Sequence, residues 1–206
     1  MKIHLVRHGE TDWNKERRIQ GHAESNLTAL GQQQAKSLQS VFNAIDIARV
    51  YCSSSQRTRQ TAANIFAEKP VETIYSDELK EIFLGPWEAQ LYEDIRSIEP
   101  ESMHHFWHEP HKFNVDGAET FTELQLRGKN KFDEIVRTGT SGEEIAIVSH
   151  GAMIKAILCA LEPRPIEKLW EPPKMHNCAH SIVEITHHPE SQDYTATITQ
   201  YANVVQ

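Results

Sequence analysis

The sequence lacks the features that mark membrane, disulfide-rich and nucleic-acid-binding proteins. None of its apolar runs approaches the roughly 20 residues that a membrane-spanning helix needs. Its three cysteines, Cys52, Cys159 and Cys178, are widely spaced, which favours buried core residues over a disulfide framework or a zinc site. Lys and Arg number 21 against 29 Asp and Glu, and a net charge of −8 argues against general nucleic-acid binding. We therefore expect a cytoplasmic protein that binds neither membranes nor nucleic acid.

The composition is that of an ordinary folded domain. Hydrophobic residues make up 39% of the chain and charged residues 24%. A length of 206 residues suits a single domain spanning the whole chain and can bury a substantial core. The acidic balance still allows an anionic substrate, because a local pocket of Arg and His can bind phosphate within an acidic protein.

Short apolar runs and helical patterns alternate along the chain. The runs are rich in strand formers and predict strands over 3–6, 49–52, 71–75 and 145–148. Apolar spacing and composition predict helices over 28–45, 56–67 and 153–161, and another after residue 120. Residues 12–21 read as a long polar loop, and 177–185 and 195–198 as two antiparallel closing strands. This order predicts a three-layer α/β/α sandwich with a mostly parallel central sheet.

Polar residues suited to phosphate chemistry follow several of the predicted strands. Arg7 and His8 come directly after the first strand, and His150 comes after the strand at 145–148. Serines 53–55 follow the second strand and would cap the next helix, leaving N–H groups free for an anion, with Arg57 in its first turn. Ligands bind at the carboxyl ends of strands in open α/β sheets, and Arg binds phosphate in a bidentate manner. The pattern therefore predicts a phosphate site at this edge of the sheet.

Four segments in this order resemble motifs of the histidine phosphatase superfamily, the phosphoglycerate mutase-like proteins. They are Arg7-His8-Gly9-Glu10, the segment 53–62, the segment 79–88, and Ser149-His150-Gly151-Ala152. The likeness runs from about residue 2 to residue 185. It departs from the family pattern at Ser54-Ser55, where Pro-Leu is frequent, and at Phe83 and Ala89. The resemblance implies that residues 89–138 form a helical lid insertion over the active site.

The resemblance also implies a role for each site residue. His8 would attack phosphorus and form a phosphohistidine, while Glu81 would protonate the leaving oxygen and then activate water. Arg7, Arg57 and His150 would hold the phosphoryl oxygens. Further substrate contacts are expected from Asn14, Gln20, Gly21 and Gly151. No metal or other cofactor is required, since Arg and His supply the positive charge.

Several alternatives stay open. A phosphoglycerate mutase would use the same residues but return the phosphate to a second hydroxyl, and a non-catalytic scaffold would bind a phosphoprotein.

The lid histidines His104, His105, His108 and His111 suit a solvated or substrate-facing surface better than a metal site. Trp87 and Trp107 are expected to pack rather than stack on a ligand. The expected substrate is a small phosphorylated metabolite, which the sequence does not name. The oligomeric state is open, although exposed lid aromatics would suit a homodimer.

Overall fold

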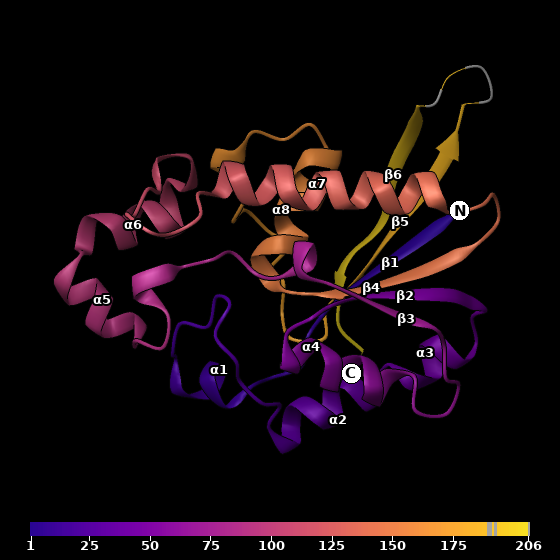
Figure 1. Cartoon of the computed structure of the whole chain (residues 1–206), viewed down its shortest axis with the longest axis horizontal. Coiled ribbons are helices and arrows are strands. Elements are labelled where there is room, and N and C mark those ends of the chain that lie inside the picture. Colours follow the sequence, from indigo (N-terminus) through magenta and orange to yellow (C-terminus); the bar gives the residue numbers. More distant parts are fainter. Residues whose placement is uncertain (189–190, 192, 206) are drawn as a thin grey trace.

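The structure is a computed structural model that describes residues 1–188, 191 and 193–205. A six-stranded sheet in the order β3-β2-β4-β1-β5-β6 forms its centre (Figure 1). The strands are β1 (Lys2–Arg7), β2 (Ile47–Ser53), β3 (Thr73–Ser76), β4 (Glu144–Ser149), β5 (His180–His187) and β6 (Tyr194–Asn203). The first four strands are parallel, whereas β5 and β6 are antiparallel to their neighbours. The predicted mostly parallel sheet with two closing antiparallel strands is confirmed.

Helices cover both faces of this sheet. The α-helices are α1 (Asp12–Glu16), α2 (Ala29–Ser37), α3 (Gln39–Asn43), α4 (Gln56–Ile65), α5 (Tyr92–Ile98), α6 (Pro100–His108), α7 (Phe121–Thr138) and α8 (Gly151–Leu161). Short 3₁₀ helices occupy Asp77–Leu79, Gly85–Trp87, Pro110–Lys112 and Ile166–Lys168. In Figure 1, α2, α3 and α4 lie on one side of the sheet and α7 and α8 on the other. This is the predicted three-layer sandwich.

Side chains of the central strands point alternately to the two faces of the sheet, and the protein therefore has two hydrophobic cores. Leu5 and Ile147 point to the α7–α8 side, where they join a cluster that includes Phe132. Val6 and Val148 point to the opposite side and join a cluster with residues of α2, α3 and α4. All four of these strand residues are fully buried, so the apolar runs are explained by burial on both faces of a parallel sheet.

Two local expectations are wrong. The helix predicted over 28–45 is split into α2 and α3, because the chain tightens at Leu38, whose N–H bonds to the carbonyl of Ala35. The Ser37 hydroxyl donates to the carbonyl of Gln33, a contact that bends helices. The polar loop predicted over 12–21 contains α1, which Thr11 caps with Asn14 in a reciprocal capping box.

The segment expected to form the lid has two parts. Helices α5 and α6 lie beyond the carboxyl ends of the strands, at the left of Figure 1. Helix α7 instead packs along α8, because Phe121, Leu124, Phe132 and Ile135 form a fully buried stripe. The residues that overhang the strand ends are therefore those before α7, and the extent of the expected insertion over 89–138 stays a prediction. None of the helices in the described ranges has the length and apolar character that a membrane crossing needs.

A buried pair of histidines links β1 to β5. His4 Nε2 lies 2.8 Å from a Glu144 carboxylate oxygen, and His4 Nδ1 lies 2.9 Å from His180 Nε2. Gln200 Nε2 lies 3.2 Å from His180 Nδ1. The chain of bonds is complete when both rings are neutral, with Gln200 donating to His180, His180 to His4, and His4 to the carboxylate. Burial lowers the pKa of both rings, and that of His180 falls to about 4.

This pair should make the protein less stable in acid. A folded-state pKa of about 4, below the unfolded value near 6.5, means that the stabilisation is complete above pH 6.5 and is lost as the pH falls towards 4. The loss for His180 is about 3 kcal/mol over this window. We expect urea unfolding of His180→Gln to lose less free energy between pH 7 and pH 4.5 than the wild type does. Equal losses in the two proteins would contradict this assignment.

Candidate active site

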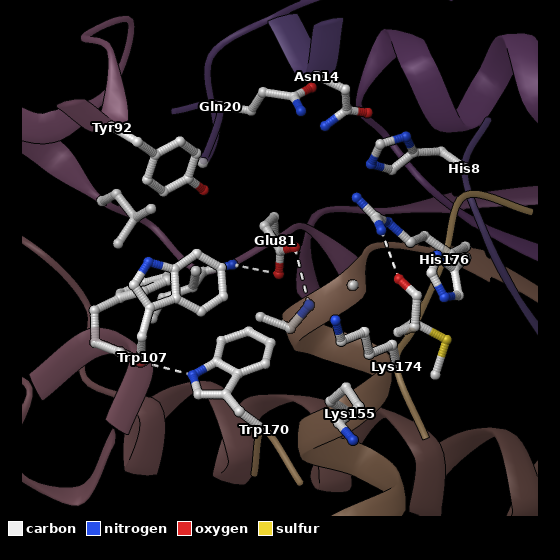
Figure 2. Close-up of a pocket in the computed structure, with 18 of the residues that line it drawn as sticks. His8, Asn14, Gln20, Glu81, Tyr92, Trp107, Lys155, Trp170, Lys174 and His176 are labelled. Carbon is white, nitrogen blue, oxygen red and sulfur yellow. Dashed lines mark hydrogen bonds between the residues drawn. The ribbon is translucent and has the colours of Figure 1, made fainter. Parts of the chain in front are cut away.

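A cavity of about 520 Å³ opens at the carboxyl ends of β1 and β4, and residues of α5 and α6 form part of its lining (Figure 2). One part carries the predicted phosphate-binding side chains and the other part is aromatic. The lining residues are Arg7, His8, Asn14, Gln20, Gly21, Arg57, Glu81, Ile82, Leu84, Tyr92, Phe106, Trp107, Gly151, Ala152, Lys155, Trp170, Lys174, Met175 and His176. All of the predicted site residues except His150 therefore line one cavity.

His8 is held as a neutral base whose Nε2 atom is left for chemistry. Its Nδ1 lies 2.8 Å from the carbonyl oxygen of Gly9, to which only a protonated Nδ1 can donate. Burial and the charges of Arg57 and Arg7 hold the pKa of His8 well below its usual 6.5. The neutral ring therefore carries its proton on Nδ1 and its lone pair on Nε2, as a nucleophile needs. The backbone of His8 is anchored by Asn177 and Cys178, which both donate to its carbonyl oxygen.

Arg7 and Arg57 bring two buried cations to the same region. Arg7 Nη1 donates to the carbonyl of Met175, while Arg7 Nε is buried and has no hydrogen-bond acceptor among the described residues. Arg57 donates from Nη1 to Ala23 and from Nη2 to Gly21, at 2.9 and 2.7 Å. Burial lowers the pKa of both side chains, that of Arg57 to about 10, so both remain charged at neutral pH. An unsatisfied buried guanidinium donor favours an anionic ligand.

His150 lies behind this cavity rather than in its wall. Its ring is fully buried and makes an edge contact with His8, the ring centroids being 5.3 Å apart. Arg57 Nε donates to His150 Nδ1 at 3.2 Å, which leaves the proton on Nε2 for the Ser53 hydroxyl at 2.8 Å. His150 therefore contacts both Arg57 and His8. Its predicted contact with phosphate stays a prediction.

Glu81 reaches into the cavity from the segment after β3. Its carboxylate accepts three backbone N–H bonds, from Ile82, Ala152 and Met153, each 3.0 Å long. Two of these donors are free N–H groups at the start of α8, where the helix dipole favours an anion. The sequence predicted that this helix starts at Met153, whereas it starts at Gly151. The sequence analysis therefore did not reveal that the first turn of the helix binds Glu81.

The remaining predicted contacts come from the turn after β1 and from α8. Asn14 and Gln20 lie along the upper edge of the cavity in Figure 2. Asn14 Oδ1 accepts from Asn177 at 3.1 Å, and Gln20 Oε1 accepts from Thr11 at 3.1 Å, so the carbonyl ends are fixed. Gly151 leaves room for Arg7, since a Cβ at this position would stand 3.3 Å from Arg7 Nε.

The serines after β2 do not cap α4 as predicted. Ser55 makes no side-chain capping bond, and the first helical N–H, that of Gln56, is instead taken by the Glu24 carboxylate at 2.7 Å. The Ser53 hydroxyl is occupied by His150. The N–H of Gln56 at this helix start therefore binds the protein's own carboxylate and is not free for an anion.

The sequence did not reveal the second part of the cavity. Tyr92, Trp107 and Trp170 form an aromatic wall there (Figure 2). Trp107 packs against both of the other rings, as expected, and it also lines the cavity. Trp170 Nε1 donates to the carbonyl of Phe106 at 2.6 Å, which fixes the indole plane. Burial and the Glu81 charge raise the pKa of Tyr92 to about 12, so its hydroxyl stays protonated. Trp87, by contrast, packs in the core as predicted.

Cationic side chains complete the second part of the cavity. Lys155 donates to the carbonyls of Glu171 and Pro173, at 2.6 and 3.1 Å, and burial lowers its pKa to about 8. Lys174 and His176, on the loop that these bonds hold, also line the cavity. The sequence did contain a signal for this part of the cavity, which is the position of Lys155 within an apolar helical run. A lysine among buried residues needs hydrogen-bond partners.

The lid histidines lie outside the cavity. His104 and His108 are exposed and their rings meet at a tilted angle on α6, with ring centroids 4.8 Å apart. Among residues 1–188, 191 and 193–205, no group of three or more His, Cys, Asp or Glu side chains is arranged to hold a metal ion. The solvated alternative fits this placement.

Comparison with known proteins identifies the family that this fold and site define. Residues 3–194 match the histidine phosphatase superfamily, branch 1, and the chain belongs to that family. A structure of Bacillus stearothermophilus YhfR superposes with a TM-score of 0.93 at 33% identity, covering 98% of this chain and 97% of that one. The fold and the family predicted from the sequence are both confirmed.

Curated relatives carry the names of both phosphatases and mutases. Phosphoserine phosphatase 1 of Hydrogenobacter thermophilus is 31% identical over 193 residues, covering 94% of this chain and 89% of that protein. The probable phosphoglycerate mutase GpmB of Escherichia coli is 30% identical over 186 residues, covering 89% and 85%. Family membership therefore fixes the class of chemistry and leaves the reaction to be argued from the site.

Proposed function

We propose that this protein is a metal-independent phosphomonoesterase that hydrolyses a small phosphorylated metabolite through a phosphohistidine on His8. The observation that carries the proposal is the state of His8. Its ring is kept neutral beside Arg7 and Arg57, and its proton is committed to the Gly9 carbonyl, so the Nε2 lone pair is available. A ligand-binding scaffold needs the cations but has no use for a nucleophile held in this form.

In the first step, the Nε2 lone pair of His8 forms a bond to phosphorus while the bond from phosphorus to the leaving oxygen breaks. Glu81, as a carboxylic acid, gives its proton to that oxygen, so an alcohol leaves and a carboxylate remains. Arg7 and Arg57 offset the charge on the phosphoryl oxygens, which is the main requirement of phosphoryl transfer. These two side chains supply the positive charge that the transfer requires.

In the second step, the Glu81 carboxylate takes a proton from water, and the water oxygen forms a bond to phosphorus. The bond between phosphorus and Nε2 breaks, and its electron pair returns to the ring. The products are inorganic phosphate, neutral His8 and protonated Glu81, which is the starting state. A mutase would differ only in admitting a second alcohol in place of water.

Release of inorganic phosphate tests the function directly. We expect turnover of 4-nitrophenyl phosphate and of O-phosphoserine in the presence of a metal chelator. Failure to release phosphate from any of a panel of esters, combined with exchange of phosphate between phosphoglycerates, would favour the mutase. A folded protein inactive in both assays would favour the scaffold.

We further propose that the leaving group of the substrate lies against the aromatic wall. The wall faces the nucleophile across the cavity, and Trp107 keeps 37% of its surface exposed, which is unusual for an indole inside a domain. We expect Trp107→Ala to raise KM for benzyl phosphate about tenfold and to leave KM for ethyl phosphate nearly unchanged. The two leaving alcohols have similar acidity, so the comparison isolates ring contact. Equal changes for both esters would contradict it.

A further inference from the structure

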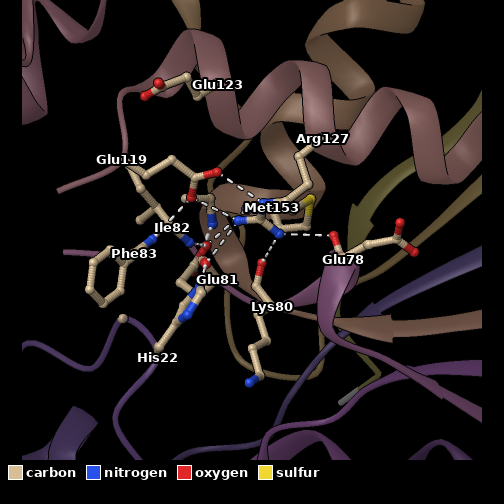
Figure 3. A network of polar contacts seen from close by, with 12 residues as sticks. His22, Glu78, Lys80, Glu81, Ile82, Phe83, Glu119, Glu123, Arg127 and Met153 are labelled. Carbon is tan, nitrogen blue, oxygen red and sulfur yellow. Dashed lines mark hydrogen bonds and ion pairs between the residues drawn. The ribbon is translucent and has the colours of Figure 1, made fainter. Parts of the chain in front are cut away.

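Arg127 and Glu119 bind the segment that carries Glu81 (Figure 3), and neither of them lines the catalytic cavity. We call residues 78–84 the acid segment. Arg127, on α7, donates from Nη1 to the carbonyls of Glu78 and Lys80, at 2.8 and 3.0 Å. It donates from Nη2 to the carbonyl of Glu81 itself, at 3.1 Å. One guanidinium thus holds three carbonyl oxygens of four consecutive residues.

Glu119 completes the grip. Its carboxylate accepts from Arg127 Nε at 2.9 Å and from Arg127 Nη2 at 2.8 Å. The same carboxylate accepts from the N–H of Phe83 at 3.1 Å, and the Glu119 N–H donates to the Phe83 carbonyl at 2.8 Å. Glu119 therefore binds both the cation and the far end of the acid segment.

These contacts use the whole hydrogen-bonding capacity of Arg127. A guanidinium has five N–H groups, and the five bonds described occupy one on Nε, two on Nη1 and two on Nη2. None is left for a substrate, and the side chain lines a shallow groove with His22 and Phe83 rather than the catalytic cavity. A lysine, with three donors on a single atom, could not make this set.

Glu81 is consequently held through both its backbone and its side chain. Its carbonyl oxygen accepts from Arg127 and also lies 2.9 Å from His22 Nε2. Its carboxylate meets the free N–H groups of Ala152 and Met153 at the start of α8. Loss of the contacts from Arg127 would let the acid segment shift while the start of α8 stays in place. The carboxyl group of Glu81 would then lose its alignment with the leaving oxygen.

We propose that Arg127 is a positioning residue for the proton donor, which it orients by holding the backbone of the acid segment. The proposal rests on the proposed function, because it assigns Arg127 a role in the protonation step. A residue that positions an acid matters most when the leaving group needs a proton. Alkyl phosphates leave as alcohols and need one, whereas 4-nitrophenolate is stable as an anion and leaves without it.

The test compares kcat/KM for ethyl phosphate and for 4-nitrophenyl phosphate in Arg127→Met. This parameter covers the steps up to departure of the leaving group, so hydrolysis of the phosphoenzyme does not enter it. We expect a loss of about 100-fold for ethyl phosphate and of less than about fivefold for 4-nitrophenyl phosphate. Arg127→Lys should show the same selective loss, and Arg127→Met combined with Glu81→Gln should lose little more than Glu81→Gln alone.

Arg137→Met is the matched control, because Arg137 is an exposed arginine on the same helix. We expect it to leave both values unchanged. If Arg127→Met or Arg127→Lys is folded and loses the same factor on both esters, the role is structural and the inference is overturned. A wild type inactive on both esters would overturn the proposed function and this inference with it.

Discussion

Replacement of His8 by alanine is expected to reduce kcat for every phosphate ester by at least about 10³-fold. The imidazole supplies the only atom that we assign to covalent catalysis, and alanine leaves Arg7 and Arg57 in place. Ester binding should therefore survive, and inorganic phosphate should still inhibit or bind with similar affinity. Steady-state turnover and phosphate binding by calorimetry, measured on the same preparation, separate the two effects.

The control for this variant is His104→Ala, which removes an exposed imidazole from α6 outside the cavity. It should keep wild-type turnover. His8 is buried, so thermal unfolding of both variants must be followed to show that the alanine protein is folded. A folded His8→Ala variant that retains more than about a tenth of wild-type turnover would exclude covalent catalysis by this residue.

Replacement of Glu81 by glutamine is expected to separate substrates by their leaving groups. The amide keeps the size of the side chain and can still accept a bond from the start of α8, but it has no carboxylic proton to give. We expect kcat/KM to fall by about 10²- to 10⁴-fold for ethyl phosphate and by much less for 4-nitrophenyl phosphate.

The second step provides an independent view of Glu81. Without a carboxylate to accept the proton of water, the phosphoenzyme should hydrolyse slowly, so Glu81→Gln should show a burst of 4-nitrophenolate followed by a slow phase. Glu119→Gln, which keeps Glu81 but alters the outer contacts of its segment, should show a smaller burst. Equal losses on both esters and no burst in Glu81→Gln would contradict its assignment as the acid and base.

The sequence predicted the sheet and most of the residues at its edge because both depend on local signals. A buried strand followed by Arg7 and His8 places those side chains at the carboxyl edge whatever the rest of the chain does. The same reasoning holds for the strands before Arg57 and His150. Because the parallel strands are buried on both faces, they appear in the sequence as short, continuous apolar runs.

Features that depend on contacts between distant segments could not be predicted in this way. Arg127 binds carbonyl oxygens, which any residue type would present at 78, 80 and 81, so the acid segment carries no side-chain signal for it. The place of His150 behind the cavity depends on Ser53 and Arg57, which meet it only in the folded chain. Trp107 and Trp170 are brought together by the fold, 63 residues apart.

The most direct test of the account is to trap the phosphoenzyme and find the atom that carries the phosphoryl group. Glu81→Gln is mixed with an aryl phosphate, quenched in alkali, where phosphohistidine is stable, and digested for mass spectrometry. We predict one phosphoryl group, on His8, that disappears in the double variant with His8→Ala. A phosphoryl group on another residue, or release of phosphate by an enzyme that never becomes labelled, would contradict the account.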